Sequence, residues 1–239
     1  AVYVSGFIPI NDTIRKIVCF TEPLDSVFID IMAKFPEVAQ VYYNDRFSYN
    51  RIYPFIDVLT QYEPKLHIPD FNFYFLADEK HNPSKKAVWV NEPYVDPAGR
   101  GWMVSAIAPV YYKDKLMGVP GIDVTINLLT DKYFKNNNED IIIIDGTGTI
   151  VSANEMTINR LNLPPLTNHK YFETIKQNTF KKEDYNLLNN KNKSIRTAFE
   201  KIVKNNSINE EFSVDNTNYE VFVSKIQELD WYLIKVAKK

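Results

Sequence analysis

The feature that most constrains the fold is a series of strand-like runs separated by turn residues in the middle of the chain. Residues 87–91, 102–112 and 116–126 are rich in apolar, β-branched and aromatic residues, which favour strands. Asp96-Pro97-Ala98-Gly99 lies between the first two runs, and Lys113-Asp114-Lys115 lies between the last two. Turns of this kind join antiparallel strands, because a parallel pair needs a longer crossover connection. The sequence therefore predicts an antiparallel meander.

Further elements are predicted upstream of these runs. Residues 22–35 carry apolar side chains at helical spacing, which indicates an amphipathic helix. Residues 38–44 alternate between the two faces of a strand, and residues 46–53 resume the extended character, as in a β-hairpin. Residues 54–70 are interpreted as a proline-containing connector, and the polar residues 78–86 as an exposed loop.

The second half of the chain shows a similar order of elements. The turn Asp145-Gly146-Thr147-Gly148 lies between two short apolar runs, and an Asp-Gly pair in this position is a strong hairpin signal. The other predictions are helices at 128–134, 171–177 and 195–203, and strands at 210–214, 219–225 and 231–236.

Two halves of mixed helix and antiparallel strand predict an α+β fold made of two PAS-like modules. We expect residues 1–35 to form an N-terminal helical stalk, followed by one module at 36–134 and a second at 135–239. The polar run 135–140 is the predicted boundary between them.

Composition and charge argue against several classes of function. The net charge is -2 and no basic stripe is interleaved with aromatic residues, so nucleic-acid binding is not expected. Cys19 is the single cysteine and the three histidines are widely spaced, so we expect neither a metal site nor a cofactor. No apolar run approaches the ~20 residues that cross a bilayer. Because the sequence lacks an initiator Met, we expect a segment of a longer protein.

One motif admits an enzymatic interpretation. The run IIIIDGTGT around Asp145 resembles the aspartyl-phosphate loop of haloacid-dehalogenase phosphatases and P-type ATPases, in which a carboxylate attacks phosphorus beside Mg²⁺. However, Gly146 stands where the ATPases have Lys, and Thr147 stands where the phosphatases have a second Asp. A hairpin turn is therefore favoured, and a Mg²⁺-dependent phosphatase is kept as the alternative.

The most specific pattern extends over residues 71–123. It begins FNFYFLAD, continues VWVNEPYVDPAGRGWMVSAIAPVYY and closes with LMGVPGIDVTI. This pattern resembles the membrane-distal, ligand-binding module of double Cache domains, which are found on chemoreceptors and sensor histidine kinases. The matching positions are Trp89, Pro93, Tyr94, Asp96, Pro109, Val110, Gly118, Gly121, Ile122 and Asp123.

The resemblance implies a non-enzymatic, extracytoplasmic sensor of a small molecule. Transmembrane helices outside this chain would flank it in the intact receptor, which could be a homodimer. In the amino-acid-binding branch of the family, carboxylates at the positions of Asp96 and Asp123 bind the ligand ammonium, and aromatic rings form the pocket walls. The ligand-binding residues implied here are Phe71, Phe73, Tyr74, Trp89, Tyr94, Asp96 and Asp123.

This chain departs from that branch at one position. The family binds the ligand carboxylate through an Arg two residues before the aromatic pair, and here that position is Phe71. Without this bidentate partner an α-amino acid would bind less well, so we expect an amine or another small cationic or polar ligand. Lys65, Lys80 or Arg100 could supply a substitute from a loop. A third interpretation is a protein-interaction module whose pocket is filled by its own side chains.

Overall fold

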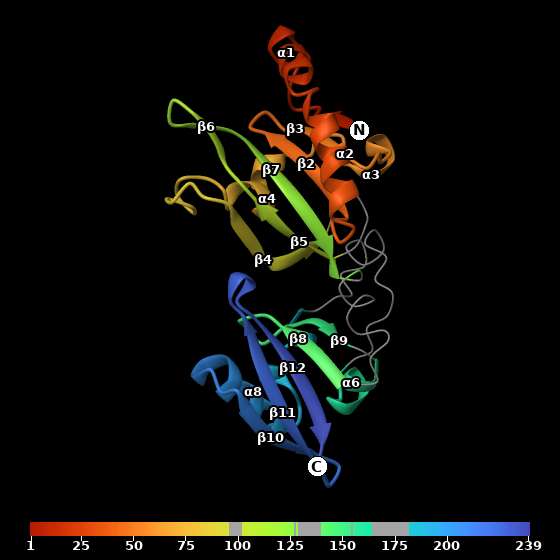
Figure 1. Ribbon diagram of the computed structural model, residues 1–239, viewed down its shortest axis with the longest axis vertical. Helices are drawn as coiled ribbons and strands as arrows, with labels where there is room; N and C mark the ends of the chain where they lie inside the picture. Colours follow the sequence, from red (N-terminus) through yellow and green to blue (C-terminus); the bar gives the residue numbers. More distant parts are fainter. Residues whose placement is uncertain (96–101, 127, 129–139, 154, 164–181) are drawn as a thin grey trace. The chain divides into compact units, whose positions relative to one another are not determined.

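The computed structural model describes residues 1–95, 102–126, 128, 140–153, 155–163 and 182–239. These residues form two compact units, each with an antiparallel sheet and helices, which confirms the α+β class (Figure 1). The first unit comprises Ala1–Val90 and Tyr94–Thr125, and the second comprises Asn91–Pro93 and Ile126–Lys239. The module boundary predicted between residues 134 and 135 lies outside the described residues and stays a prediction.

The first unit is built on a seven-stranded antiparallel sheet. Its strands follow the order β1-β3-β2-β7-β5-β4, and β6 pairs with the first residues of β7. The predicted meander is confirmed by the pairing of β4 with β5 and of β5 with β7, and the predicted hairpin by the pairing of β2 with β3. The strands are β1 (Val2–Val4), β2 (Gln40–Asp45), β3 (Tyr49–Tyr53), β4 (Val88–Val95), β5 (Trp102–Ile107), β6 (Val110–Tyr112) and β7 (Lys115–Thr125).

The N-terminal segment, residues 1–35, contains one short strand and two helices, and its role as a stalk stays a prediction. Strand β1 pairs with β3 inside the sheet, and two helices follow, α1 (Asp12–Phe20) and α2 (Leu24–Lys34). Helix α2 matches the helix predicted at 22–35, and α1 lies within the N-terminal segment that was expected to be helical. The Asn11 side chain caps α1 by accepting a hydrogen bond from the Ile14 backbone N–H (3.1 Å). Ile14, Ile17 and Val18 form a short apolar stripe along α1, and Ile14 is its one buried residue.

The sheet of the first unit is covered on both faces. Helix α2 packs on one face, where Phe28 belongs to an apolar cluster with Val41 and Ile122 (Figure 1). The other face is covered by residues 54–86, which contribute Ile68 and Phe73 to a larger cluster. This covering segment contains α3 (Val58–Gln61), η1 (Ile68–Asp70) and α4 (Asn72–Phe75).

Two glycines of β7 allow rings from β2 to lie against its backbone. A Cβ atom at Gly121 would lie 2.4 Å from Cζ of Tyr42, and one at Gly118 would lie 2.4 Å from Cζ of Tyr43. Both distances are too short for real contacts, and successive strand residues face opposite ways. The two tyrosines therefore lie against β7 on opposite faces of the sheet.

On the α2 face, Arg51 of β3 holds the junction of the two N-terminal helices. The guanidinium is buried and donates to Asp25 Oδ2 of α2 (2.6 Å), to the Tyr49 hydroxyl (2.9 Å) and to the Val18 carbonyl of α1 (2.9 Å). A buried charge with several partners is strongly oriented. Arg51 thereby attaches the junction of α1 and α2 to β3. The neighbouring residue of this strand, Asn50, faces the opposite side of the sheet.

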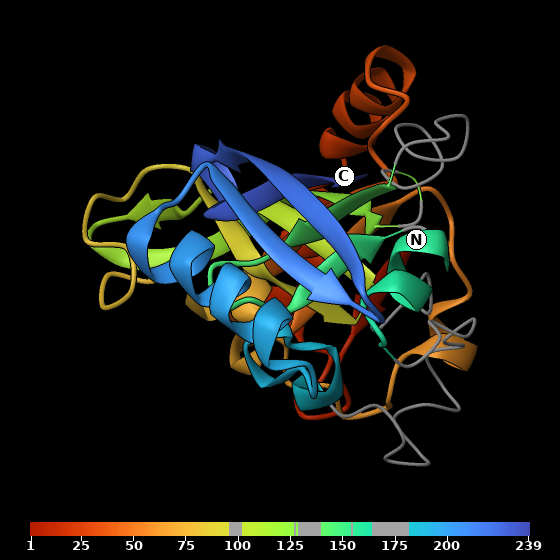
Figure 2. The ribbon, with the colours of Figure 1, turned by 90° about the horizontal axis from the view of Figure 1, so that it is seen from below.

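The second unit has a five-stranded antiparallel sheet in the order β10-β11-β12-β8-β9. Helix α8 packs against this sheet, chiefly on β10 (Figure 2). The predicted hairpin, helix 195–203 and three closing strands are confirmed, whereas helix 171–177 and residues 129–134 lie outside the described residues. The elements are β8 (Asp140–Ile144), β9 (Ile150–Ala153), α6 (Glu155–Arg160), η2 (Lys182–Tyr185), η3 (Leu187–Asn189), α8 (Lys193–Asn205), β10 (Asn209–Val214), β11 (Thr217–Ile226), η4 (Gln227–Leu229) and β12 (Trp231–Lys238).

Candidate functional site

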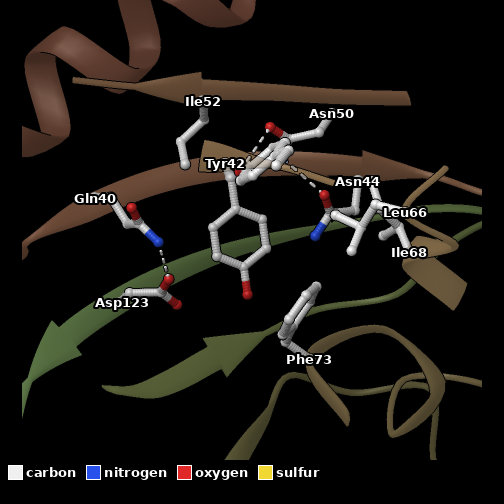
Figure 3. Close-up of a pocket in the computed structure, with 10 residues that line it drawn as sticks. Gln40, Tyr42, Asn44, Asn50, Ile52, Leu66, Ile68, Phe73 and Asp123 are labelled. Atoms are coloured by element: carbon white, nitrogen blue, oxygen red, sulfur yellow. Dashed lines mark hydrogen bonds between the residues drawn. The ribbon is translucent and has the colours of Figure 1, made fainter. Parts of the chain in front are cut away.

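A pocket lies in the first unit between the sheet and its covering segment 54–86 (Figure 3). Its free space is about 20 Å³, roughly the room that one water molecule needs. Side chains from β2, β3, β7 and the covering segment line it. The described lining residues are Gln40, Tyr42, Asn44, Asn50, Ile52, Tyr62, Leu66, Ile68, Phe73 and Asp123.

Asp123 is the one charged side chain among the described lining residues. It lies in β7 between two neighbouring strands, where its register partners are Gln40 of β2 and Ser105 of β5. The carboxylate has no exposed surface. Gln40 Nε2 donates to Oδ2 (2.5 Å), and the Ser105 hydroxyl donates to Oδ1. A carboxylate removed from water in this way requires hydrogen-bonding partners, and both neighbouring strands supply one.

The opposite end of the pocket carries neutral amides. Asn44 of β2 and Asn50 of β3 are register partners, and Asn50 Nδ2 donates to Asn44 Oδ1 (2.8 Å). The Tyr62 hydroxyl of the covering segment contacts Asn50 Oδ1 at 3.4 Å. The pocket thus has a carboxyl group at the Asp123 end and a pair of amides at the other end.

Aromatic rings occupy the space between these ends. Tyr42 extends from β2 between Asp123 and Phe73 in Figure 3, with its ring centroid 6.1 Å from that of Phe73. Phe71 stacks on Phe73 at 5.0 Å. The neighbouring Tyr74 is buried in the same apolar cluster, and its burial raises the pKa of the hydroxyl above its usual value.

The structure brings some of the expected ligand-binding residues together. Asp123 and Phe73 line the pocket, Phe71 lies behind Phe73, and Tyr74 belongs to the adjoining core without being a lining residue. The role of each residue in binding stays a prediction.

Three other expected residues are not among the described lining residues of the pocket. Trp89 is 36% exposed, and Val90 beside it is fully buried in the pocket-side cluster, so Trp89 points to the opposite face of β4. Asp96 and the side chain of Tyr94 lie outside the described residues.

The sequence analysis missed the polar residues of the hairpin. Gln40, Tyr42 and Asn44 share one face of β2, and Asn50 lies beside them on β3. In the sequence this alternation is typical of a strand with one solvent-facing side. The positions become buried because segment 54–86, which follows β3, folds back over this face of the sheet.

The Asp145 carboxylate belongs to its own hairpin turn. Its Oδ1 accepts hydrogen bonds from the Thr147 backbone N–H (2.8 Å), the Thr147 hydroxyl (2.6 Å) and the Thr149 backbone N–H (3.0 Å). Within the described part of the chain, no three Cys, His, Asp or Glu side chains form a group that could hold a metal ion. The contacts of Asp145 are those of a turn, and no described neighbour supports the phosphatase alternative.

Comparison with solved structures identifies the fold, although no protein-family profile and no curated protein sequence matches the chain. The extracellular domain of mmHK1S-Z3, described as a histidine kinase, superposes with a TM-score of 0.56 at 16% identity, over 89% of this chain and 77% of that one. The ligand-binding domain of the Pseudomonas fluorescens chemoreceptor CtaA, in complex with L-isoleucine, gives 0.53 at 16% identity, over 91% and 72%.

A third neighbour is the ligand-binding domain of the Pseudomonas aeruginosa chemoreceptor PctB in complex with L-glutamine. It superposes with a TM-score of 0.53 at 14% identity, over 85% of this chain and 69% of that one. The chain has the fold of a double Cache sensor domain. The double Cache resemblance drawn from residues 71–123 is therefore confirmed at the level of the fold. No helix among the described residues is long and apolar enough to cross a membrane.

Proposed function

We propose that the chain is the extracytoplasmic sensor of a transmembrane signalling receptor, and that its first unit binds a small amine-containing ligand. The observation that supports this proposal most directly is the Asp123 carboxylate, fully buried at one end of a pocket with polar and aromatic walls. The fold shared with chemoreceptor and histidine kinase ligand-binding domains supports a sensing role. Residues 36–134 would form the membrane-distal module and residues 135–239 the proximal one.

The charge of the lining favours an amine over a free amino acid. An ammonium group leaving water needs carboxylate or carbonyl acceptors, and it tolerates the faces of aromatic rings. Asp123 supplies the carboxylate, and Tyr42 and Phe73 supply rings. An amino acid also needs a partner for its own carboxylate, but Phe71 occupies the position of the family's Arg, and no Lys or Arg is found among the described lining residues.

The size of the pocket requires a rearrangement on binding. Free space of about 20 Å³ is too small for a molecule of several heavy atoms. Tyr42 and Phe73 belong to the lining, and a ligand would displace one of them or move the covering segment 54–86. Such a difference between the free and bound states is what a sensor needs, because a ligand shifts an equilibrium only by its differential affinity for two states.

The test is a binding experiment on the purified chain with a panel of primary amines, amino acids and small carboxylates. A true ligand at about 100 times its Kd should raise the free energy of unfolding by roughly 2.7 kcal/mol, seen as a higher Tm. Asp123→Asn should abolish this shift. Asp114→Asn is the matched control, because Asp114 lies in the same unit with its side chain 95% exposed and at positive φ, where Asn is tolerated. A shift that survives in Asp123→Asn contradicts the assignment.

The small free space also favours a second candidate function. A pocket that its own side chains fill is expected of a module that recognises a protein partner instead of a small molecule. In that case no compound stabilises the fold, and substitutions in the exposed loop 78–86 weaken binding of the partner. A Tm shift with any member of the panel that is lost in Asp123→Asn rules this candidate out.

A further inference from the structure

The orientation of the Gln40 side chain is fixed by its neighbour. Gln40 is 2% exposed, and one end of its amide lies 2.5 Å from Asp123 Oδ2. The end that faces the carboxyl group is the NH₂ group, which donates a hydrogen bond to it. The same nitrogen lies 3.6 Å from the sulfur of Met103. The Gln40 carbonyl oxygen therefore makes neither of these two contacts.

That carbonyl oxygen has no hydrogen-bond partner among the described residues, although it is buried. Buried amide oxygens are nearly always paired, and an unpaired one is destabilising. Here the oxygen belongs to a residue that lines the pocket beside Asp123. It is a buried hydrogen-bond acceptor, and the contact between the amide nitrogen of Gln40 and Asp123 fixes the position of its amide group.

We propose that Gln40 Oε1 and the Asp123 carboxylate together bind one ligand nitrogen, so that the site selects ammonium groups with at least two N–H bonds. This inference rests on the proposed function and names the class of ligand. Aromatic rings attract any cation, including one without N–H bonds. Two fixed acceptors discriminate further, because each needs its own donor and is left unpaired by a fully methylated nitrogen. The ligand class is thus a primary or secondary amine, and quaternary ammonium compounds are excluded.

The experiment uses four probes in which N–H bonds are replaced one at a time by methyl groups: propylamine and its N-methyl, N,N-dimethyl and N,N,N-trimethyl forms. All four are cations at pH 7, since alkyl ammonium groups lose a proton only near pH 10. Calorimetric titration of the wild-type chain should give similar affinities for the first two probes. Affinity should fall about tenfold at the dimethyl form, the ordinary contribution of one hydrogen bond to a charged group, and fall again at the trimethyl form.

Gln40→Met supplies the decisive comparison, because methionine has a similar length but no amide oxygen. With one acceptor left, the variant should bind propylamine about tenfold more weakly, and its affinity should fall only at the trimethyl form. A general loosening of the pocket would weaken the binding of all four probes equally. It would not change the degree of methylation at which the affinity falls. Steric exclusion of methyl groups gives the same profile in both proteins.

The outcomes separate this inference from the proposed function. The role of Gln40 is wrong if the wild type binds all four probes equally. It is also wrong if the affinity of Gln40→Met falls at the dimethyl form, as in the wild type. In both cases amine sensing stands, provided that Asp123→Asn abolishes binding. If the wild type binds no amine of the panel, both proposals fail.

Discussion

The two units differ in where some of their buried polar side chains lie. In the second unit, a fully buried apolar cluster around Phe199 and Ile142 is accompanied by buried polar side chains that include Asp140, Asp145 and Asn190. In the first unit, the face beneath segment 54–86 buries Gln40, Asn44 and Asp123 beside its apolar cluster. Burying polar groups is unfavourable unless they are paired, so this face is a poor solution for stability alone. The comparison shows that Gln40, Asn44 and Asp123 of the first unit are gathered at one pocket, whereas the buried polar side chains named in the second unit belong to turns and to a strand end.

The largest expected effect tests the packed core of the second unit. Phe199 is fully buried in α8, with its ring centroid 6.3 Å from that of Phe212. Phe199→Ala should lower the free energy of unfolding by about 3–5 kcal/mol, through lost apolar burial and a remaining cavity. Urea unfolding measures this change, and amine binding under native conditions should persist. A loss below 1 kcal/mol would show that this core is not tightly packed.

A smaller effect concerns a second buried carboxylate of the first unit. Asp45 ends β2 and is 2% exposed, and burial raises its pKa to about 6, opposed by the hydrogen bond from the Phe47 N–H and by the charge of Arg46. The unfolded value is lower, about 3.9, so the folded state binds this proton more tightly. The stabilising contribution of protonated Asp45 is therefore complete below about pH 4 and is lost as the pH rises through 6.

Asp45→Asn is neutral at every pH, like the protonated carboxyl group. Its amide oxygen can still accept the hydrogen bond from the Phe47 N–H. Its free energy of unfolding should exceed that of the wild type by up to about 3 kcal/mol at pH 7, since one pKa unit corresponds to about 1.4 kcal/mol. The difference should vanish near pH 4. Urea unfolding of both proteins from pH 4 to 7 measures it, and a difference independent of pH would contradict the raised pKa.

The smallest effect sharpens the comparison at the pocket itself. Asp123→Asn removes a buried charge, yet its side chain can still accept from Gln40 or Ser105. We expect the ligand-free protein to gain about 1 kcal/mol, because residues selected for binding are often not the most stabilising ones. Urea unfolding without ligand gives the value. A loss of more than 2 kcal/mol would mean that Asp123 is needed for folding, and the contrast between the units would then disappear.

The strands and turns could be predicted because their signals are local. The Asp145-Gly146 turn and the alternation in β2 appear within a few residues, and the corresponding hairpins form. Asp123 could be singled out because a carboxylate between Ile122 and Val124 needs a special environment. Gln40 and Asn44 could not, since nothing local distinguishes a polar residue facing water from one covered by segment 54–86. Trp89 shows the converse, because its aromatic character does not tell which face of β4 it occupies.

The contact between Tyr42 and Gly121 makes the two positions an epistatic pair. Any side chain at residue 121 would collide with the ring of Tyr42, so a substitution there is tolerated only after residue 42 has become smaller. If Gly121 were substituted before Tyr42, the intermediate variant would contain a steric clash between the new side chain and the tyrosine ring. Since Tyr42 also lines the pocket, a smaller residue at position 42 would enlarge the pocket and at the same time make room for a side chain at residue 121. After a side chain is present at residue 121, a tyrosine at residue 42 would clash with it. Reversion of residue 42 alone would therefore not be tolerated, and the enlarged pocket would be retained.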